Sequence, residues 1–363
     1  MARRDHDVKI IQPLPHTPPA PFDLILGRDR ALASRAPRKE KNTDFEVYRP
    51  SYLHIPRKPV SNALRFAKVA ARHIHKMEPR PDVVVCDYAW PAARAIEFLC
   101  KDIPVVIHGR GSDVTQIPRY PFLRRKLQEC LVSSGNWCGV SQNIVDRLNE
   151  LGNSPNRGML TPNGVDMSIF HPGSQAAARH ALEIFHDRPI VLVVGHLIGR
   201  KRPLLALESF LEGAPKDAQL VFIGQGRLKN KLQHKILNNR LQRRVFILNE
   251  MDQEQLALWY RAASVFLITS SREGRPNVVL EALASGLPVV ATKTLGSAEI
   301  LQAMPDFLAP IGDPCAIGRC LSLALKSPLT PKTWVEQVTH LTWKNACTKL
   351  ECVLQTAIDR GQP

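Results

Sequence analysis

Residues 270–299 read SSREGRPNVVLEALASGLPVVATKTLGSAE, and they directly follow an apolar strand candidate, SVFLIT, at 264–269. The segment predicts a loop, a helix over 277–285, a second buried strand at 287–292 and a further loop. A strand, a helix and a second strand in this order form the repeating unit of a parallel α/β sheet. In such sheets, ligands bind beyond the carboxyl ends of the strands, where these loops lie.

The same alternation extends toward both ends of the chain. The C-terminal half also contains the buried strand candidates PIVLVVG, AQLVFIG and RVFILN, and the N-terminal half contains PDVVVCDY, IPVVIHG and WCGVS. Apolar periodicity predicts helices between them. These helices are expected at 62–77, 90–101, 119–132, 142–151, 203–212, 229–241 and 252–263. Two doubly wound parallel sheets in tandem are therefore predicted.

The expected domains follow from this alternation. An N-terminal Rossmann-like domain is expected over 1–170 and a C-terminal Rossmann-like domain over 171–335, with a C-terminal helix over 336–363 that crosses back to the first domain. A proline-rich stretch, PLPHTPPAPF, begins at residue 13, and irregular basic sequence is expected from there to about residue 59. A chain of 363 residues suits two domains better than one.

The composition narrows the class of protein. Hydrophobic residues make up 44% of the chain, enough for two cores, while 49 Lys and Arg against 33 acids give a net charge of +16. A spread basic excess favours polyanionic ligands such as a diphosphate, and without a nucleic-acid motif or basic–aromatic stripe we expect no nucleic-acid partner. No apolar run reaches the roughly 18 residues of a membrane span, and the N-terminus has no secretory pattern, so a cytoplasmic protein is expected.

The cysteines support a reducing compartment. None forms a Cys-x-x-Cys pair or lies at zinc-finger spacing from a histidine, so they are interpreted as small buried apolar residues. They are Cys86, Cys100, Cys130, Cys138, Cys315, Cys320, Cys347 and Cys352.

Two glutamates frame the predicted helix of the opening segment. Glu273 lies in the loop just after a strand, and Glu281 lies in the helix. Carboxylates accept hydrogen bonds from vicinal hydroxyl pairs, so one can meet a sugar and the other a ribose. Pro276 is expected at the first helical position, where the free N–H groups and the helix dipole favour an anion. On spacing alone, two solvated surface acids remain an equal alternative.

The motifs resemble those of a known family. EGRPNVVLEALASGLPVVAT, at 273–292, resembles the Glu-x7-Glu signature of family 4 glycosyltransferases, and VVGHLIGRKRP resembles the strand and loop that carry a phosphate-binding lysine, which falls on Lys201. FIGQGRLKNKL resembles a Gly-x-Gly-x-Leu turn, while VSQNIVDRLNELG and TPNGVDMSIFHP resemble the end of the N-terminal domain. The resemblance covers about 81–359 and is nearest to teichuronic-acid-type polysaccharide enzymes.

The resemblance implies a GT-B fold, with two Rossmann-like domains facing a cleft that holds a nucleotide-diphosphate sugar. It implies transfer with retention of configuration, without an obligate metal or other cofactor. Glu281 is then expected to hold the ribose hydroxyls and Glu273 the transferring sugar, while Lys201 and helix N–H groups neutralise the diphosphate. The remaining donor-binding residues implied are Gly195, His196, Arg275, Pro276, Asn277 and Val278.

Some positions depart from the family pattern. His196 stands where the family often has an arginine that shares the diphosphate, and Arg200 or Arg202 could replace that arginine. A solvated loop residue is the alternative for His196. In IHGRGSDVT, both His108 and Arg110 match family positions after the strand, and both are expected to be catalytic, with a core role as the alternative for His108.

Asp87, in CDYAWP, occupies a position often held by histidine. The strand, Gly-rich loop and helix that open the family fold are also expected to be missing before DHDVKIIQP. A truncated or catalytically impaired paralogue that acts as a binding or scaffold subunit is therefore one alternative function. A nucleotide-sugar epimerase of the same architecture is another, and isomerised donor without acceptor would identify it.

The acceptor is expected to be a glycan or a lipid-linked molecule of polysaccharide biosynthesis. RYPFLRRK, at 119–126, combines basic and aromatic residues and is a candidate contact with an anionic membrane at the inner face of the cell envelope. An ordinary solvated helix start is the alternative for this stretch.

Overall fold

The computed structural model describes residues 6–16, 39–41, 45–99, 101–327 and 329–361. The chain divides into two compact units, of which the first comprises Met1–Thr161 with Cys347–Pro363 and the second comprises Pro162–Ala346. The boundary between the units falls after Thr161, somewhat before the expected end of the first domain at residue 170. None of the helices in the described part of the chain has the length and apolar character that a membrane crossing requires.

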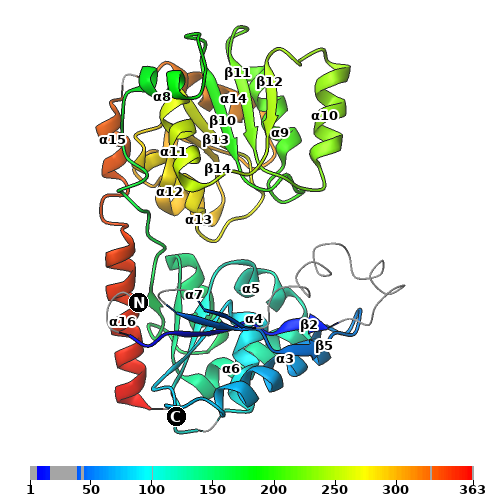
Figure 1. Cartoon of the computed structure of the whole chain (residues 1–363), viewed down its shortest axis with the longest axis vertical. Helices are drawn as coiled ribbons and strands as arrows, with labels where there is room; N and C mark the ends of the chain where they lie inside the picture. Colours follow the sequence, from blue (N-terminus) through cyan, green and yellow to red (C-terminus); the bar gives the residue numbers. More distant parts are fainter. Residues whose placement is uncertain (1–5, 17–38, 42–44, 100, 328, 362–363) are drawn as a thin grey trace. The chain divides into compact units, whose positions relative to one another are not determined.

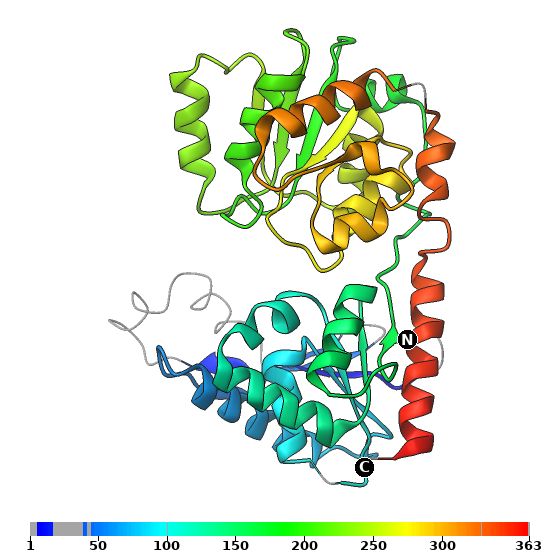
Figure 2. The same ribbon diagram turned by 180° about the vertical axis from the view of Figure 1, so that it is seen from behind.

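The second unit is built on a six-stranded parallel sheet in the order β12-β11-β10-β13-β14-β15. Helices α9 and α14 pack together on one face, and α8, α11 and α12 cover the other (Figures 1 and 2). The strands are β10 (Ile190–Val194), β11 (Gln219–Ile223), β12 (Val245–Leu248), β13 (Val265–Ile268), β14 (Val289–Thr292) and β15 (Leu308–Ala309). The helices are α8 (Gln175–Ala181), α9 (Pro203–Gly213), α10 (Lys229–Asn238), α11 (Gln253–Ala262), α12 (Asn277–Ala284), α13 (Leu295–Ile300), α14 (Pro314–Leu325) and α15 (Pro331–Glu336).

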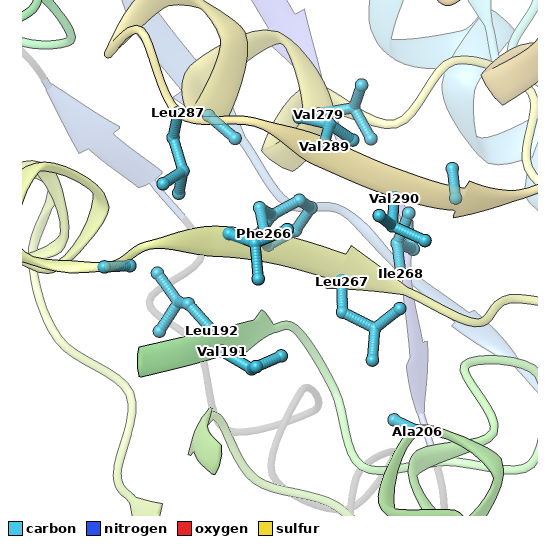
Figure 3. Close-up of a cluster of buried hydrophobic side chains, with 14 of the residues drawn as sticks. Val191, Leu192, Ala206, Phe266, Leu267, Ile268, Val279, Leu287, Val289 and Val290 are labelled. Carbon is cyan, nitrogen blue, oxygen red and sulfur yellow. The ribbon is translucent and has the colours of Figure 1, made fainter. Parts of the chain in front are cut away.

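The apolar composition of the central strands explains this arrangement. Strands buried on both faces have near-continuous apolar sequences, as in VFLI of β13, whose four residues are all buried. Side chains from β10, β13 and β14 pack together with Val279 of α12 and Ala206 of α9 (Figure 3). Adjacent parallel strands in this core place the loops that follow β10 and β13 at the same edge of the sheet.

The first unit contains a four-stranded parallel sheet in the order β6-β7-β8-β9. Its strands are β6 (Val84–Asp87), β7 (Val105–Gly109), β8 (Trp137–Gly139) and β9 (Met159–Leu160), and its longer helices are α3 (Pro59–Ile74), α6 (Pro121–Ser134) and α7 (Gln142–Leu151). The helix α16 (Trp343–Arg360) returns to this unit, where Val353 and Ala357 pack on Val106 and Cys138.

The region expected to be irregular up to residue 59 carries short strands instead. They are β1 (Lys9–Ile11), β2 (Leu14–His16), β3 (Lys39–Lys41), β4 (Glu46–Tyr48) and β5 (Ser51–Leu53). β1 pairs in parallel with β4, β4 pairs in antiparallel with β3, and β2 pairs in parallel with β5. Strands of three residues give too little periodicity to be predicted from sequence.

The helix expected over 90–101 is also interrupted. It begins as α4 (Ala89–Ala92) and continues as the 3₁₀ helix η2 (Ala93–Glu97), and Trp90 has an extended backbone with φ −116° and ψ 126°. Trp90 precedes Pro91, and proline disfavours the helical conformation in the residue before it. The expected C-terminal helix over 336–363 likewise begins later, at Trp343. Cys100 lies outside the described residues, while the other seven cysteines are free thiols. Cys86, Cys130 and Cys138 are buried as expected, but Cys315 and Cys352 are exposed, so the expectation of burial was wrong for these two.

Candidate active site

The loops after β10 and β13 are held against each other at the carboxyl edge of the second unit's sheet. The Ser271 N–H donates to the Arg200 carbonyl at 2.8 Å. The Thr269 hydroxyl donates to the Lys201 carbonyl at 3.1 Å and to the Arg202 carbonyl at 3.0 Å. These bonds fix the backbone that carries Arg200 and Lys201, and they hold it next to the loop that carries Glu273.

Glu273 forms the centre of a charged cluster. Its Oε1 lies 2.8 Å from Lys201 Nζ and accepts a hydrogen bond from Ser270 Oγ at 2.6 Å. Its Oε2 lies 2.7 Å from Arg200 Nη1. The Glu273 side chain is only 8% exposed, whereas Lys201 and Arg200 retain more contact with solvent. The structure therefore brings two predicted site residues together and adds Arg200 as the second cation.

The electrostatics of Glu273 follow from this packing. Burial opposes its ionisation, but the charge of Lys201 and hydrogen bonds from Lys201 and Ser270 outweigh burial and hold the pKa of Glu273 below its usual value. The carboxylate is therefore ionised near neutral pH and partly neutralises two cations that would otherwise repel each other. An anionic ligand that contacts Lys201 and Arg200 would take over part of that role.

Glu281 lies on α12 in a different environment. Its Oε2 accepts a hydrogen bond from the Tyr260 hydroxyl at 3.0 Å, and the same hydroxyl lies 3.3 Å from the Val278 carbonyl oxygen. Burial raises the pKa of Glu281 although the Tyr260 hydrogen bond and the Lys201 charge act in the opposite direction. The charge of Lys201 thus acts on both glutamates, but their pKa values are shifted in opposite directions.

The segment between the two glutamates is shaped by Arg275. Its guanidinium is buried and pairs with Glu299 of α13 through Nη1 at 2.9 Å, while its Nε has no hydrogen-bond partner among the described residues. Pro276 is the residue that caps α12, one position before the helix, rather than its first helical residue as predicted. Asn277 and Val278 begin the helix, where the first N–H groups have no intrahelical acceptor.

Gly195 lies at the tip of β10 with a left-handed φ of 135°, next to the aliphatic chain of Lys201. The neighbouring loop after β11 approaches it closely, because a Cβ on Gly224 would lie 2.3 Å from the Gly195 carbonyl oxygen. His196 is 70% exposed and its Nδ1 lies 3.5 Å from Glu250 Oε1. His196 therefore faces an acidic residue outside the Glu273 cluster, whereas Arg200 lies within that cluster.

A second cluster lies at the carboxyl ends of β6 and β7 in the first unit. Asp87 Oδ1 lies 2.9 Å from His108 Nδ1 and 2.8 Å from Arg110 Nε. His108 is buried, and its Nε2 lies 3.2 Å from Thr161 Oγ1. Burial opposes the ionisation of Asp87, but the hydrogen bonds and charges of His108 and Arg110 hold its pKa well below the usual range. The structure thus pairs both predicted catalytic residues of this unit with one carboxylate.

The loop after β7 is anchored by Asp113. Its carboxylate accepts hydrogen bonds from the backbone N–H groups of Ala89 at 2.7 Å and Gly111 at 2.7 Å, and also from that of Arg110. Burial raises the pKa of Asp113 despite these bonds. Asp113 therefore fixes the backbone next to Arg110.

Sequence reasoning missed several residues that shape these clusters. Ser270, Tyr260 and Glu299 contact Glu273, Glu281 and Arg275 respectively. Asp87 was singled out only as a departure from the family pattern, and its pairing with His108 was not expected. Ser270 and Asp87 stand at strand ends, where a polar residue after an apolar run is a usable signal. No group of three or more His, Cys, Asp or Glu residues within the described ranges could hold a metal ion.

Two family models match this chain over consecutive ranges. Residues 1–169 match Glycosyltransferase Family 4, and residues 174–340 match Glycosyl transferases group 1. Among curated relatives, TuaC of Bacillus subtilis, named as a glycosyltransferase of teichuronic acid biosynthesis, is 26% identical over 298 residues, which cover 80% of this chain and 73% of TuaC.

Solved structures with the same fold include a sucrose-phosphate synthase from Thermosynechococcus elongatus, with a TM-score of 0.73 and 20% identity over 90% of this chain and 87% of that one. The Anabaena protein HepE in complex with UDP has a TM-score of 0.69 and 16% identity, over 96% of this chain and 99% of HepE.

The paired parallel-sheet units and the two matching models define a glycosyltransferase of the GT-B fold. The chain belongs to the glycosyltransferases, with a family 4 match over its N-terminal half and a group 1 match over its C-terminal half, which confirms the resemblance stated from its motifs, and it acts in polysaccharide or glycoconjugate biosynthesis.

Proposed function

We propose that this protein is a retaining, metal-independent glycosyltransferase that uses a nucleotide-diphosphate sugar, with the diphosphate bound by Lys201 and Arg200. The observation that carries the proposal is the arrangement of these two cations around Glu273, beside the Glu281–Tyr260 pair. Negative charge grows on the β-phosphate as the glycosidic C–O bond breaks, and preorganised cations stabilise that charge. The two cations can neutralise the diphosphate, as a metal ion does in other enzymes.

The two carboxylates have separate proposed roles. Glu273, ionised and fixed by Ser270, accepts hydrogen bonds from hydroxyls of the transferring sugar. Glu281 accepts hydrogen bonds from the ribose, and Tyr260 fixes its position. The backbone N–H groups at Asn277 and Val278 open α12 and contribute donors for sugar or phosphate oxygens. Gly195 leaves space beside Lys201 because it has no side chain.

The first unit is proposed to hold the acceptor, a glycan or a lipid-linked molecule. Arg110 and His108 are proposed to act in transfer, with their orientation set by Asp87. Tyr120 and Phe122 are exposed at the start of α6 beside exposed arginines, which supports contact with an anionic membrane surface. This location implies a cytoplasmic protein that meets the inner face of the membrane.

Nucleotide binding tests the donor site directly. Calorimetric titration with UDP, GDP and ADP, each in the presence of EDTA, should reveal binding of at least one diphosphate. Lys201→Ala should weaken that binding by about tenfold to a hundredfold, because a hydrogen bond to a charged group is worth about 1.5–3 kcal/mol. Lys216→Ala removes an exposed lysine at the opposite end of the sheet, before β11, and should bind like the wild type.

Transfer assays then test the reaction. With the donor sugar of the nucleotide that binds, Lys201→Ala should lower the transfer rate by roughly 100-fold or more, about 3–4 kcal/mol of transition-state stabilisation. Proton NMR of fresh product should show the anomeric configuration of the donor. Equal affinity in Lys201→Ala, or product of inverted configuration, would contradict the proposal, and isomerised donor without acceptor would indicate an epimerase.

A further inference from the structure

The outer end of the second unit's sheet carries a groove remote from the Glu273 cluster. Helix α10 lies beyond β12 in both views of the molecule (Figures 1 and 2). Between them lies an open groove of about 600 Å³. The helix contributes residues at positions i, i+3, i+4 and i+7, which share one helix face. The lining residues used below are Leu237, Val245, Phe246 and Ile247.

One wall of the groove is an open strand edge. β12 is the end strand of its sheet and pairs only with β11 among the described strands. The Leu220 N–H donates to the Arg244 carbonyl at 2.8 Å, and the Gly224 N–H donates to the Leu248 carbonyl at 3.1 Å. Because alternate residues make the bonds of a parallel ladder, Val245 and Ile247 direct their backbone groups away from β11. The Val245 N–H already donates to the Leu241 carbonyl at 2.9 Å, so the Val245 carbonyl can accept from an added strand, and Ile247 can both donate and accept.

The groove also exposes apolar surface. Leu237 on α10 is 52% exposed and Phe246 on β12 is partly exposed. Large apolar side chains on both walls suit the alternate side chains of an extended segment, which enter the groove every second residue. A lipid bilayer offers no backbone groups to satisfy a strand edge, so a peptide fits this surface better.

The charge around the groove is strongly biased. Residues 218–249 contain seven Lys and Arg and no Asp or Glu. Lys235 pairs with Glu208, and the Arg244 guanidinium donates to the Pro215 and Ala218 carbonyls, so these two have internal roles. The basic residues exposed at the surface of this segment are Arg227, Lys231, Arg240 and Arg243. A second copy of the chain would bring like charges together, which disfavours pairing of two β12 edges.

We propose that the groove between α10 and β12 binds an extended, acidic peptide segment of a partner protein, which adds a strand to β12. Backbone hydrogen bonds to Val245 and Ile247 would hold the peptide, and apolar side chains would pack on Leu237 and Phe246. Acidic side chains would meet the surrounding basic residues. None of these groups belongs to the Glu273 cluster, so docking here leaves the donor site free, and the proposal does not rest on the donor assignment.

A displayed library of random peptides of about ten residues, the upper end of usual strand lengths, is the probe. Selection on the full chain should enrich peptides that alternate apolar and acidic residues. Leu237→Asp places a negative charge in the groove and should weaken the enriched peptides at least about tenfold by fluorescence anisotropy, because like charges repel. The matched control Leu211→Asp, on α9 and 43% exposed, should bind like the wild type.

Hydrogen exchange supplies a readout specific to strand addition. The bound peptide should slow exchange of the Ile247 amide, and its affinity should fall as salt is added. Enriched peptides that are not acidic, equal binding to Leu237→Asp, unchanged Ile247 exchange, or failure of any groove-dependent peptide to enrich would each overturn the proposal. Phosphatidylglycerol vesicles that bind in a Leu237-dependent way, or dimers abolished by Leu237→Asp in sedimentation, would assign the groove to a different occupant and overturn it as well.

Discussion

At the scale of single residues, the proposed donor site rests on two carboxylates whose pKa values are shifted in opposite directions. Glu273 touches two cations and a hydroxyl, so its pKa is lowered despite burial. Glu281 touches a tyrosine hydroxyl, and burial dominates, so its pKa is raised. Both positions could be predicted from the Glu-x7-Glu spacing. The difference between them could not, because it depends on Lys201, Arg200 and Tyr260, which come from other elements.

The raised pKa of Glu281 predicts a pH-dependent effect on stability. Because the folded-state pKa lies above the unfolded value of about 4.5, the neutral form stabilises the fold at low pH, and this contribution is lost as pH rises through the folded pKa. Glu281→Gln keeps an acceptor for Tyr260 and removes the buried charge. Thermal unfolding at pH 7.5 should therefore occur at a higher temperature in Glu281→Gln than in the wild type (about 2–4 °C per kcal/mol), and the difference should shrink toward pH 4.5.

The same substitution should weaken nucleotide binding, since the ribose loses a charged acceptor. An unfolding temperature of Glu281→Gln that stays below the wild type at every pH would contradict a buried, unfavourable charge at this position.

At the scale of elements, the strands and helices of the second unit were predicted closely, because buried strands and amphipathic helices have clear periods. The contacts between the loops that form the proposed site were less predictable. The contact of the 200–202 segment with Thr269 and Ser271 depends on β10 and β13 being neighbours, although two other strands lie between them in the sequence. Strand order is a tertiary property, so no local pattern indicates that Arg200 reaches Glu273.

The start of α11 affects the site through Tyr260. Asp252 caps this helix, and its Oδ1 accepts a hydrogen bond from the Gln255 N–H at 2.8 Å. Asp252→Ala should lower the free energy of unfolding by about 1 kcal/mol, the usual loss for an N-cap, whereas Asp252→Asn should retain most of the stability. Chemical denaturation of both variants measures the difference. Equal losses in Asp252→Ala and Asp252→Asn would indicate that charge, and not the cap, is responsible.

At the scale of the whole molecule, the first compact unit combines residues from both ends of the chain. The last helix, α16, begins in the second unit and ends in the first, where Val353 and Ala357 complete a small core with Val106 and Cys138. A C-terminal helix over 336–363 was expected from the sequence. Which residues it buries could not be predicted, since its apolar face has no partner nearby in the sequence.

Substitution of Val353 tests how much the packing of α16 contributes to the stability of the first unit. Val353→Thr keeps the shape of the side chain but buries a hydroxyl, which should lower stability by about 1–3 kcal/mol. Ile358→Thr changes another β-branched residue of α16 that is partly exposed, and its effect should be much smaller. Calorimetry with limited proteolysis would show which unit opens first. Loss confined to the second unit would contradict the assignment of the end of α16 to the first.

The contact between Gly195 and Gly224 has a consequence for redesign. Since a methyl group on Gly224 would lie 2.3 Å from the Gly195 carbonyl oxygen, the loop after β11 cannot carry a bulkier residue at this position while the loop after β10 keeps its course. Exchanging the loop after β10 for one of a different shape therefore requires the loop after β11 to be exchanged with it. Laboratory evolution by single substitutions should leave Gly224 unchanged.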